Sequence, residues 1–173
     1  MTRLFLAPDA SVAIELEDAP LDAMLVMCHH TGRLETGGIL IGRYGQYRDR
    51  VIVSRVTGPP RDSRRFPASF IRGITGLARR LRGDWRDGLY YVGEWHFHPF
   101  YSPEPSPTDR RQIKAFAADP SLACPRPVLL IVGGNPQDRP HLWVGVFGTG
   151  GLVELPEIEQ PVLDLEGARP GSR

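Results

Sequence analysis

Residues 93–99 read Gly-Glu-Trp-His-Phe-His-Pro, and six residues separate them from Ser-Pro-Thr-Asp at 106–109. The apolar, aromatic-rich stretch 89–98 predicts a strand. Side chains alternate between the two faces of a strand, so His96 and His98 should share one face. Histidine is the commonest metal ligand, and two imidazoles on one strand face can reach the same ion. A histidine pair also arises by chance, so it indicates a site only together with further ligands.

The same alternation predicts what surrounds the histidines. It places Val92 and Glu94 on the histidine face and Trp95 and Phe97 on the opposite face. Glu94 could therefore bind the ion itself or accept a hydrogen bond from an imidazole. We favour the hydrogen bond, because metal-binding histidines commonly use their second ring nitrogen in this way.

Two further acidic positions have both a structural and a functional interpretation. Ser106 and Asp109, with Pro107 between them, form the pattern of a capping box at the start of a helix. The same carboxylate could instead be a ligand. Glu35 precedes the glycine pair 37–38, where it could be an exposed acid at a turn, and nothing local singles it out.

The rest of the chain alternates helical and strand patterns, which indicates an α/β protein. We expect a domain over 1–156 and a loose tail over 157–173. The expected elements are a helix over 18–32 with Asp18 as N-cap and Cys28 facing the core, a hairpin of 37–42 and 50–56, a loop over 57–68, a helix over 69–82, the strand 89–98, a short helix from Pro107, and strands over 128–132 and 142–146.

Composition excludes several classes of protein. The length of 173 residues suits one domain, and 21 basic against 20 acidic residues leave a net charge of +1. That charge provides no global field for nucleic acid or an anionic membrane. Cys28 and Cys124 are the only cysteines, so neither a disulfide framework nor a cysteine zinc cluster is expected. No apolar run approaches the roughly 18 residues of a membrane span, and we expect a cytoplasmic protein.

Taken together, Glu35, then His96-Phe97-His98-Pro99, then Ser106 and Asp109 resemble the JAMM signature of the JAB/MPN metalloproteases. The resemblance is greatest to the compact prokaryotic JAB proteins, in the Gly-Glu-Trp-His and Ser-Phe segments. It implies an MPN/JAB-like, cytidine-deaminase-like single domain with a mixed curved sheet flanked by helices. Phe97 departs from the serine or threonine that many members carry between the histidines, and we expect a packing change only.

The resemblance also implies a chemistry. His96, His98 and Asp109 would bind one zinc ion, leaving a fourth position for water whose pKa the zinc lowers toward about 7. Glu35 would be the general base and proton shuttle, and Ser106 would help to stabilise the oxyanion.

The function implied is hydrolysis of the amide after the C-terminus of a ubiquitin-like modifier, in anti-phage CBASS operons or in bacterial ubiquitin-like conjugation operons. One alternative is a processing peptidase for a sulfur-carrier or ubiquitin-like precursor, and another is a non-catalytic MPN binding module. We expect the modifier or its conjugate as the partner, with no nucleic acid and no membrane. The oligomeric state, and the role of the eight arginines between 61 and 86, stay open.

Overall fold

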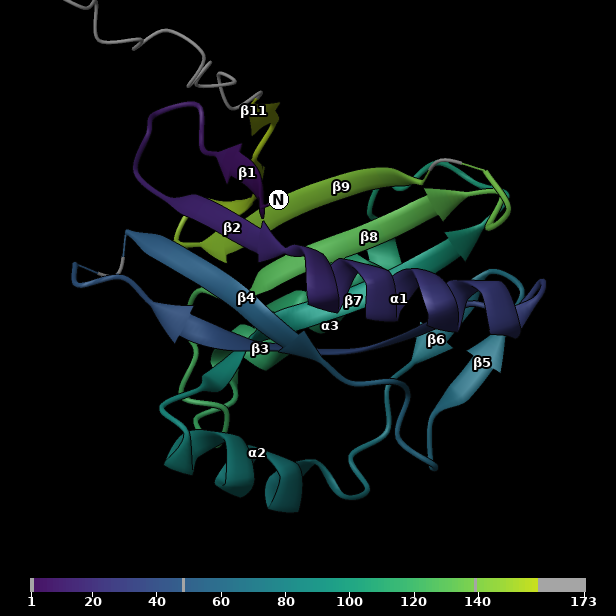
Figure 1. Ribbon diagram of the computed structural model, residues 1–173, viewed down its shortest axis with the longest axis horizontal. Coiled ribbons are helices and arrows are strands. Elements are labelled where there is room, and N and C mark those ends of the chain that lie inside the picture. The colour runs from purple at the N-terminus through teal and green to yellow at the C-terminus, as the bar shows by residue number, and fades with distance from the viewer. Residues whose placement is uncertain (1, 48, 139, 159–173) are drawn as a thin grey trace, which may run out of the picture.

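The computed structural model describes residues 2–47, 49–138 and 140–158, and one large sheet runs through them (Figure 1). Its strand order is β10-β9-β8-β7-β3-β4-β2-β1-β11, and β5 and β6 form a separate hairpin. The strands are β1 (Thr2–Leu6), β2 (Ala13–Glu17), β3 (Thr36–Tyr44), β4 (Arg50–Val56), β5 (Arg64–Phe66), β6 (Ser69–Ile71), β7 (Tyr90–Pro99), β8 (Val128–Gly134), β9 (His141–Gly148), β10 (Gly151–Glu154) and β11 (Glu157–Ile158). The helices are α1 (Asp18–Thr31), α2 (Leu77–Arg86) and α3 (Pro107–Ala118).

The large sheet is mixed and strongly curled, as predicted. β2 pairs in parallel with β4, and β7 pairs in parallel with β8. β3 is antiparallel to both of its neighbours, which confirms the predicted hairpin with β4 and places β3 beside β7. The histidine-bearing strand β7 is therefore held on both edges by backbone hydrogen bonds.

The helices cover both faces of the sheet (Figure 1). Met24 and Cys28 of α1 are buried in the large core cluster on one face, so the predicted inward position of Cys28 is confirmed. Leu77 of α2 and Ile113 of α3 pack against two smaller clusters on the opposite face. Neighbouring residues of each central strand belong to different clusters, because strand side chains alternate between faces.

The prediction of one helix over 69–82 is wrong, because the chain forms β6, a turn and then α2. The Asp62 carboxylate accepts hydrogen bonds from the backbone N–H groups of Ile74 and Thr75, both at 2.9 Å. Gly76, with φ of 85°, then turns the chain into α2. Apolar residues at helical spacing on the two sides of this turn produce the misleading pattern.

The predicted placement of Val92 on the histidine face is also wrong, because β7 carries an irregularity there. In the ladder with β3, Leu40 pairs with Gly93 and Ile41 pairs with Tyr91, so Val92 is skipped. Val92 instead lies in the large core cluster under α1. Such a bulge reverses the side-chain alternation on one side of it. Beyond it, the histidines keep their predicted common face.

Other differences concern the ends of elements. β1 and β2 precede the first element that we predict, and β5 lies inside the predicted loop 57–68. Glu17 is the N-cap of α1, so Asp18 is its first residue rather than its cap. At the predicted tail, β11 pairs with β1, and residues 159–173 lie outside the described part. Among the described residues, the structure contains no helix with the length and apolarity needed to cross a membrane.

Candidate metal centre and active site

β7 presents two buried imidazoles on the face that α3 covers. His96 is 1% exposed and His98 is 7% exposed. The Nδ1 atom of His98 lies 3.2 Å from the carbonyl oxygen of Ser102, which fixes the plane of the ring and directs Nε2 to the opposite side. The structure thus places both histidines together, as the spacing predicts.

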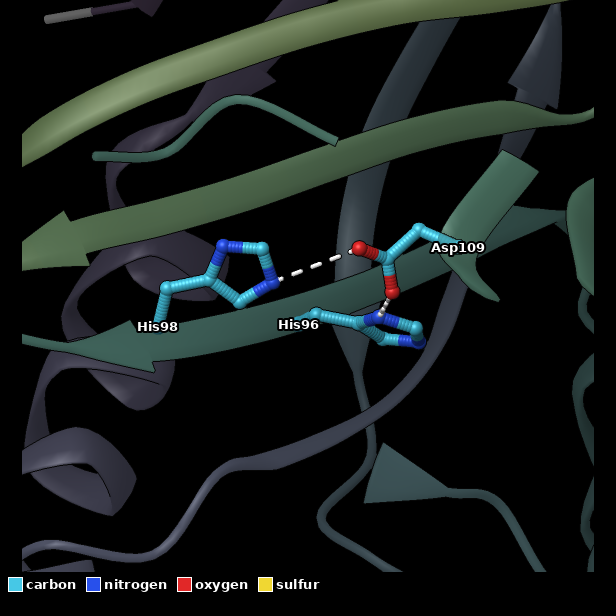
Figure 2. A group of neighbouring side chains, drawn as sticks. All are labelled: His96, His98 and Asp109. Carbon is cyan, nitrogen blue, oxygen red and sulfur yellow. Dashed lines mark hydrogen bonds and ion pairs between the residues drawn. The ribbon is translucent and has the colours of Figure 1, made fainter. Parts of the chain in front are cut away.

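Asp109 comes to these histidines from the first turn of α3 (Figure 2). One carboxylate oxygen lies 2.7 Å from Nδ1 of His96, and the other lies 3.4 Å from Nε2 of His98. Ser106 and Asp109 also form the predicted capping box. The capping and site interpretations are therefore compatible, because the cap holds the carboxylate where the two imidazoles meet.

His96, His98 and Asp109 fit a metal ion. Their potential ligand atoms all lie within 4.8 Å of one another. Nε2 of His96 is buried and has no hydrogen-bond partner among the described residues. Native proteins rarely leave a buried polar atom without a partner, and a bound metal ion would be such a partner. Burial acts to raise the pKa of Asp109, but hydrogen bonds from the two histidines outweigh it and hold that pKa well below its usual range. The carboxylate is therefore charged and available as a ligand.

Glu35 lies just before β3, at the open cleft beside this cluster. The cleft is lined by Glu35, Ala68, His98, Tyr101, Ser102, Glu104, Pro105 and Ser106. Burial is the largest influence on the pKa of Glu35 and raises it to about 7, while His98 acts to lower it and Asp109 to raise it. A carboxylate with a pKa near neutrality can both accept and release a proton at physiological pH.

Ser106 also lines the cleft, with its hydroxyl directed to Asp109. Its Oγ donates to a carboxylate oxygen of Asp109 at 2.6 Å and accepts from the Asp109 backbone N–H at 3.2 Å. The hydroxyl is thus at the site, and its described bonds are those of the helix cap. A part in stabilising an oxyanion would require it to turn from the carboxylate toward the cleft.

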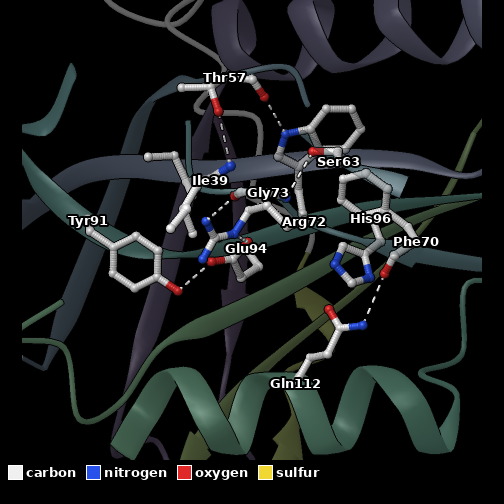
Figure 3. A network of polar contacts seen from close by, with 12 residues as sticks. Ile39, Thr57, Ser63, Phe70, Arg72, Gly73, Tyr91, Glu94, His96 and Gln112 are labelled. Atoms are coloured by element: carbon white, nitrogen blue, oxygen red, sulfur yellow. Dashed lines mark hydrogen bonds and ion pairs between the residues drawn. The ribbon is translucent and has the colours of Figure 1, made fainter. Parts of the chain in front are cut away.

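Glu94 does not contact an imidazole through any hydrogen bond in the described part of the chain. Its carboxylate accepts from the Tyr91 hydroxyl at 2.7 Å and lies 2.7 Å from Nε of Arg72 (Figure 3). Burial raises the pKa of Glu94 to about 7, against the lowering influence of Arg72 and Tyr91. The structure therefore replaces the predicted imidazole partner with an arginine and a tyrosine.

Phe70 lies at the site, although its apolar spacing predicts a helix. Its ring meets the His96 imidazole edge to face, with ring centroids 5.4 Å apart and planes at 81°. Its carbonyl oxygen accepts a hydrogen bond from Gln112 of α3 at 3.0 Å (Figure 3). The Ser-Phe segment of the family resemblance is the signal that could have indicated this contact.

Residues 18–145 match the Prok-JAB family, described as prokaryotic homologues of the JAB domain. The match covers most of the chain and includes β3, β7 and α3, so this protein belongs to the Prok-JAB family. It is a hydrolase of the JAB isopeptidase and metalloprotease class.

Individual relatives agree with this family. The chain is 41% identical over 155 residues to the CD-NTase/cGAS isopeptidase of Enterobacter hormaechei subsp. hoffmannii, covering 89% of this chain and 86% of the relative. It is 31% identical over 137 residues to a probable metalloprotease of Sinorhizobium fredii, covering 76% and 83%. The solution structure of a Desulfitobacterium hafniense protein has the same fold, with a TM-score of 0.63 and 24% identity over 82% of this chain and 88% of that one.

Proposed function

We propose that this protein is a zinc-dependent isopeptidase that removes a ubiquitin-like modifier from a nucleotidyltransferase in the cytoplasm, as part of anti-phage defence. The observation that carries the proposal is the cluster of His96, His98 and Asp109 beside Glu35, in a chain 41% identical to a protein named CD-NTase/cGAS isopeptidase. That name favours CBASS over the bacterial ubiquitin-like conjugation operons.

His96, His98 and Asp109 would hold one zinc ion. Two imidazoles and a carboxylate, without a thiolate, are a ligand set typical of catalytic zinc. When bound, the ion would act as a Lewis acid that polarises water and the carbonyl of the substrate. Because all three side chains are buried, they are held in place before a substrate arrives.

Glu35 is the residue that moves the proton in this proposal. Its carboxylate takes a proton from the attacking water and passes it to the amine that leaves. In the metal-free protein burial raises its pKa to about 7, and a group that titrates near the working pH is an effective base and an effective acid. Ser106, at the same cleft, would turn its hydroxyl from Asp109 and donate a hydrogen bond to the oxygen on which negative charge develops.

The substrate class is supported by the shape of the site. The cleft is bordered by the loop that follows β7 and is open to solvent, so an extended chain end can enter it. We infer that the C-terminal tail of the modifier lies along loop 99–106, with the scissile amide beside Glu35. Extended peptides of this kind are commonly bound through their backbone.

Cleavage assays with three substrates separate this function from its alternatives. The purified protein is mixed with a modifier joined through its C-terminus to a nucleotidyltransferase amine, with a modifier precursor that carries a C-terminal extension, and with the free modifier. We expect cleavage of the conjugate. Cleavage of the precursor alone would favour the processing peptidase, and tight binding without any cleavage would favour the binding module.

Glu35→Gln tests the mechanism in the same assay. The change keeps the size of the side chain and all three proposed zinc ligands, so zinc content and substrate binding should survive. The rate should fall by about 10² to 10⁴, the usual contribution of general acid and base assistance. Glu15→Gln on β2, which removes a carboxylate that pairs with Arg50 and does not line the cleft, is the matched control and should cleave normally. A Glu35→Gln protein that cleaves as fast as the wild type would contradict the mechanism.

A further inference from the structure

Arg72 is a buried arginine that joins the two elements carrying the proposed zinc ligands. Its side chain is only 3% exposed, and its Nε lies 2.7 Å from the carboxylate of Glu94 on β7 (Figure 3). On the other side, its guanidinium lies 4.5 Å from the ring centroid of Phe116 on α3. Its Nη1 also donates to the carbonyl oxygen of Gly73 at 2.9 Å. Arg72 thus bridges β7 and α3.

Residues 69–73, the segment that contains Arg72, also place Phe70 against His96. Gln112 of α3 donates a hydrogen bond to the Phe70 carbonyl oxygen, while the Phe70 ring and the His96 imidazole meet edge to face. On β3, a Cβ atom added to Gly37 would lie 2.8 Å from Phe70 Cε1 and 3.0 Å from His96 Cδ2. The two rings therefore lie tightly against β3, and a shift of Phe70 must shift the imidazole or leave it unsupported.

Stability alone does not account for the Arg72–Glu94 pair. Both side chains are almost completely buried, at 3% and 1% exposed. Removing two charges from water costs free energy that an apolar pair of similar volume would not cost. A buried ion pair can, however, restrict the packing of a core to one arrangement. Here that arrangement includes the spacing between His96 on β7 and Asp109 on α3.

We propose that Arg72 and Glu94 are positioning residues for zinc binding. Their ion pair clamps residues 69–73 between β7 and α3, and Phe70 transmits this constraint to the His96 imidazole. Neither residue contacts the proposed ligand atoms of the cluster in the described structure, so both act through Phe70. This inference deepens the proposed function and rests on it, because it concerns how the proposed ligands are held.

Zinc affinity in a double variant tests the inference. Arg72→Met or Glu94→Gln alone leaves one buried charge without its partner, so each single variant should be less stable. Combining the two changes removes that imbalance, so stability should be largely recovered. Zinc affinity should not be recovered. We expect it to stay at least about tenfold below the wild-type value, the usual effect of losing a supporting interaction around a metal site.

The measurement uses Zn²⁺ alone, in competition with a chromophoric chelator, at a temperature where every variant is folded. Asp84→Asn is the matched control. It removes the charge of a carboxylate on α2 that is 3% exposed and pairs with Arg55 of β4 and Arg80 of α2, none of which lines the cleft. The control should lose stability but bind zinc within twofold of the wild type. A double variant that also binds within twofold, or a control that loses as much affinity, would overturn the inference.

A second readout needs no metal. In the metal-free protein, the ring current of Phe70 should displace the NMR resonances of the His96 ring protons, which are assigned through their loss in His96→Ala. In the double variant these resonances should move toward their positions in Phe70→Leu, while those of His98 stay. If they keep their wild-type positions, the inference is wrong whether or not zinc binds. A wild-type protein that binds no zinc would instead refute the proposed function. The NMR result would still decide whether Arg72 and Glu94 position the His96 ring.

Discussion

Replacing Glu35 by glutamine should make the metal-free protein more stable at pH 8 and leave its stability nearly unchanged at pH 4. Burial raises the pKa of Glu35 from 4.5 to about 7 in the folded protein. Between these values the folded state holds a proton that the unfolded state has released, so stability falls as the pH rises through this window. Above about pH 7 the full cost of the buried charge is present, and glutamine removes it.

The size of this effect follows from the pKa. One pKa unit corresponds to about 1.4 kcal/mol, so a rise from 4.5 to about 7 sets an upper value of about 3 kcal/mol. The cleft is open to water on one side, which screens the charge, and we therefore expect a gain of about 2 kcal/mol at pH 8. At pH 4 the side chain is neutral in both states, and glutamine of similar shape should change little.

Urea denaturation of the metal-free wild type and Glu35→Gln at both pH values measures the difference directly. The slope of free energy against urea should not change, since the surface exposed on unfolding is the same. Glu15→Gln, at the surface ion pair with Arg50, should shift stability by less than about 1 kcal/mol at either pH. Equal effects of Glu35→Gln at pH 4 and pH 8, or a loss of stability at pH 8, would refute a desolvated carboxylate at this position.

Two further comparisons use pairs of matched variants. Gly37→Ala should destabilise the fold by about 1 to 3 kcal/mol and reduce cleavage, because the new Cβ would lie 2.3 Å from the Trp95 carbonyl oxygen. Gly83→Ala, in α2 with nothing within 4 Å of its added Cβ, should instead stabilise by up to about 1 kcal/mol in thermal denaturation, and similar losses at both glycines would contradict the packing argument. Ser106→Ala and Asp109→Asn should each cost about 1 kcal/mol by breaking the capping box of α3. Zinc affinity should fall at least about tenfold in Asp109→Asn only. An equal fall in both variants would mean that Asp109 affects zinc binding only through the helix cap and is not a ligand.

The candidate site illustrates how much the amino-acid sequence determines. The common face of His96 and His98 follows from the alternation of a strand, and the place of Asp109 at the start of α3 follows from the capping pattern with Ser106. Both are short-range rules that depend on neighbouring residues only. Glu35 has no such local signal. It was predicted through the family resemblance, and only the pairing of β3 with β7, which places Thr36 opposite Phe97, brings it to the histidines.

The bulge in β7 and the place of Phe70 depend on the tertiary structure, because no local sequence pattern predicts them. The bulge at Val92 lies beside Gly93, which pairs with both β3 and β8, and an added Cβ on Gly93 would lie 2.0 Å from the Val128 carbonyl oxygen. Phe70 has apolar spacing that suits a helix, yet it forms β6 and packs against His96. Apolar periodicity reports only that a side chain is buried. Which neighbour it is buried against depends on contacts between segments far apart in the chain, and these form only when the whole sheet and its helices pack together.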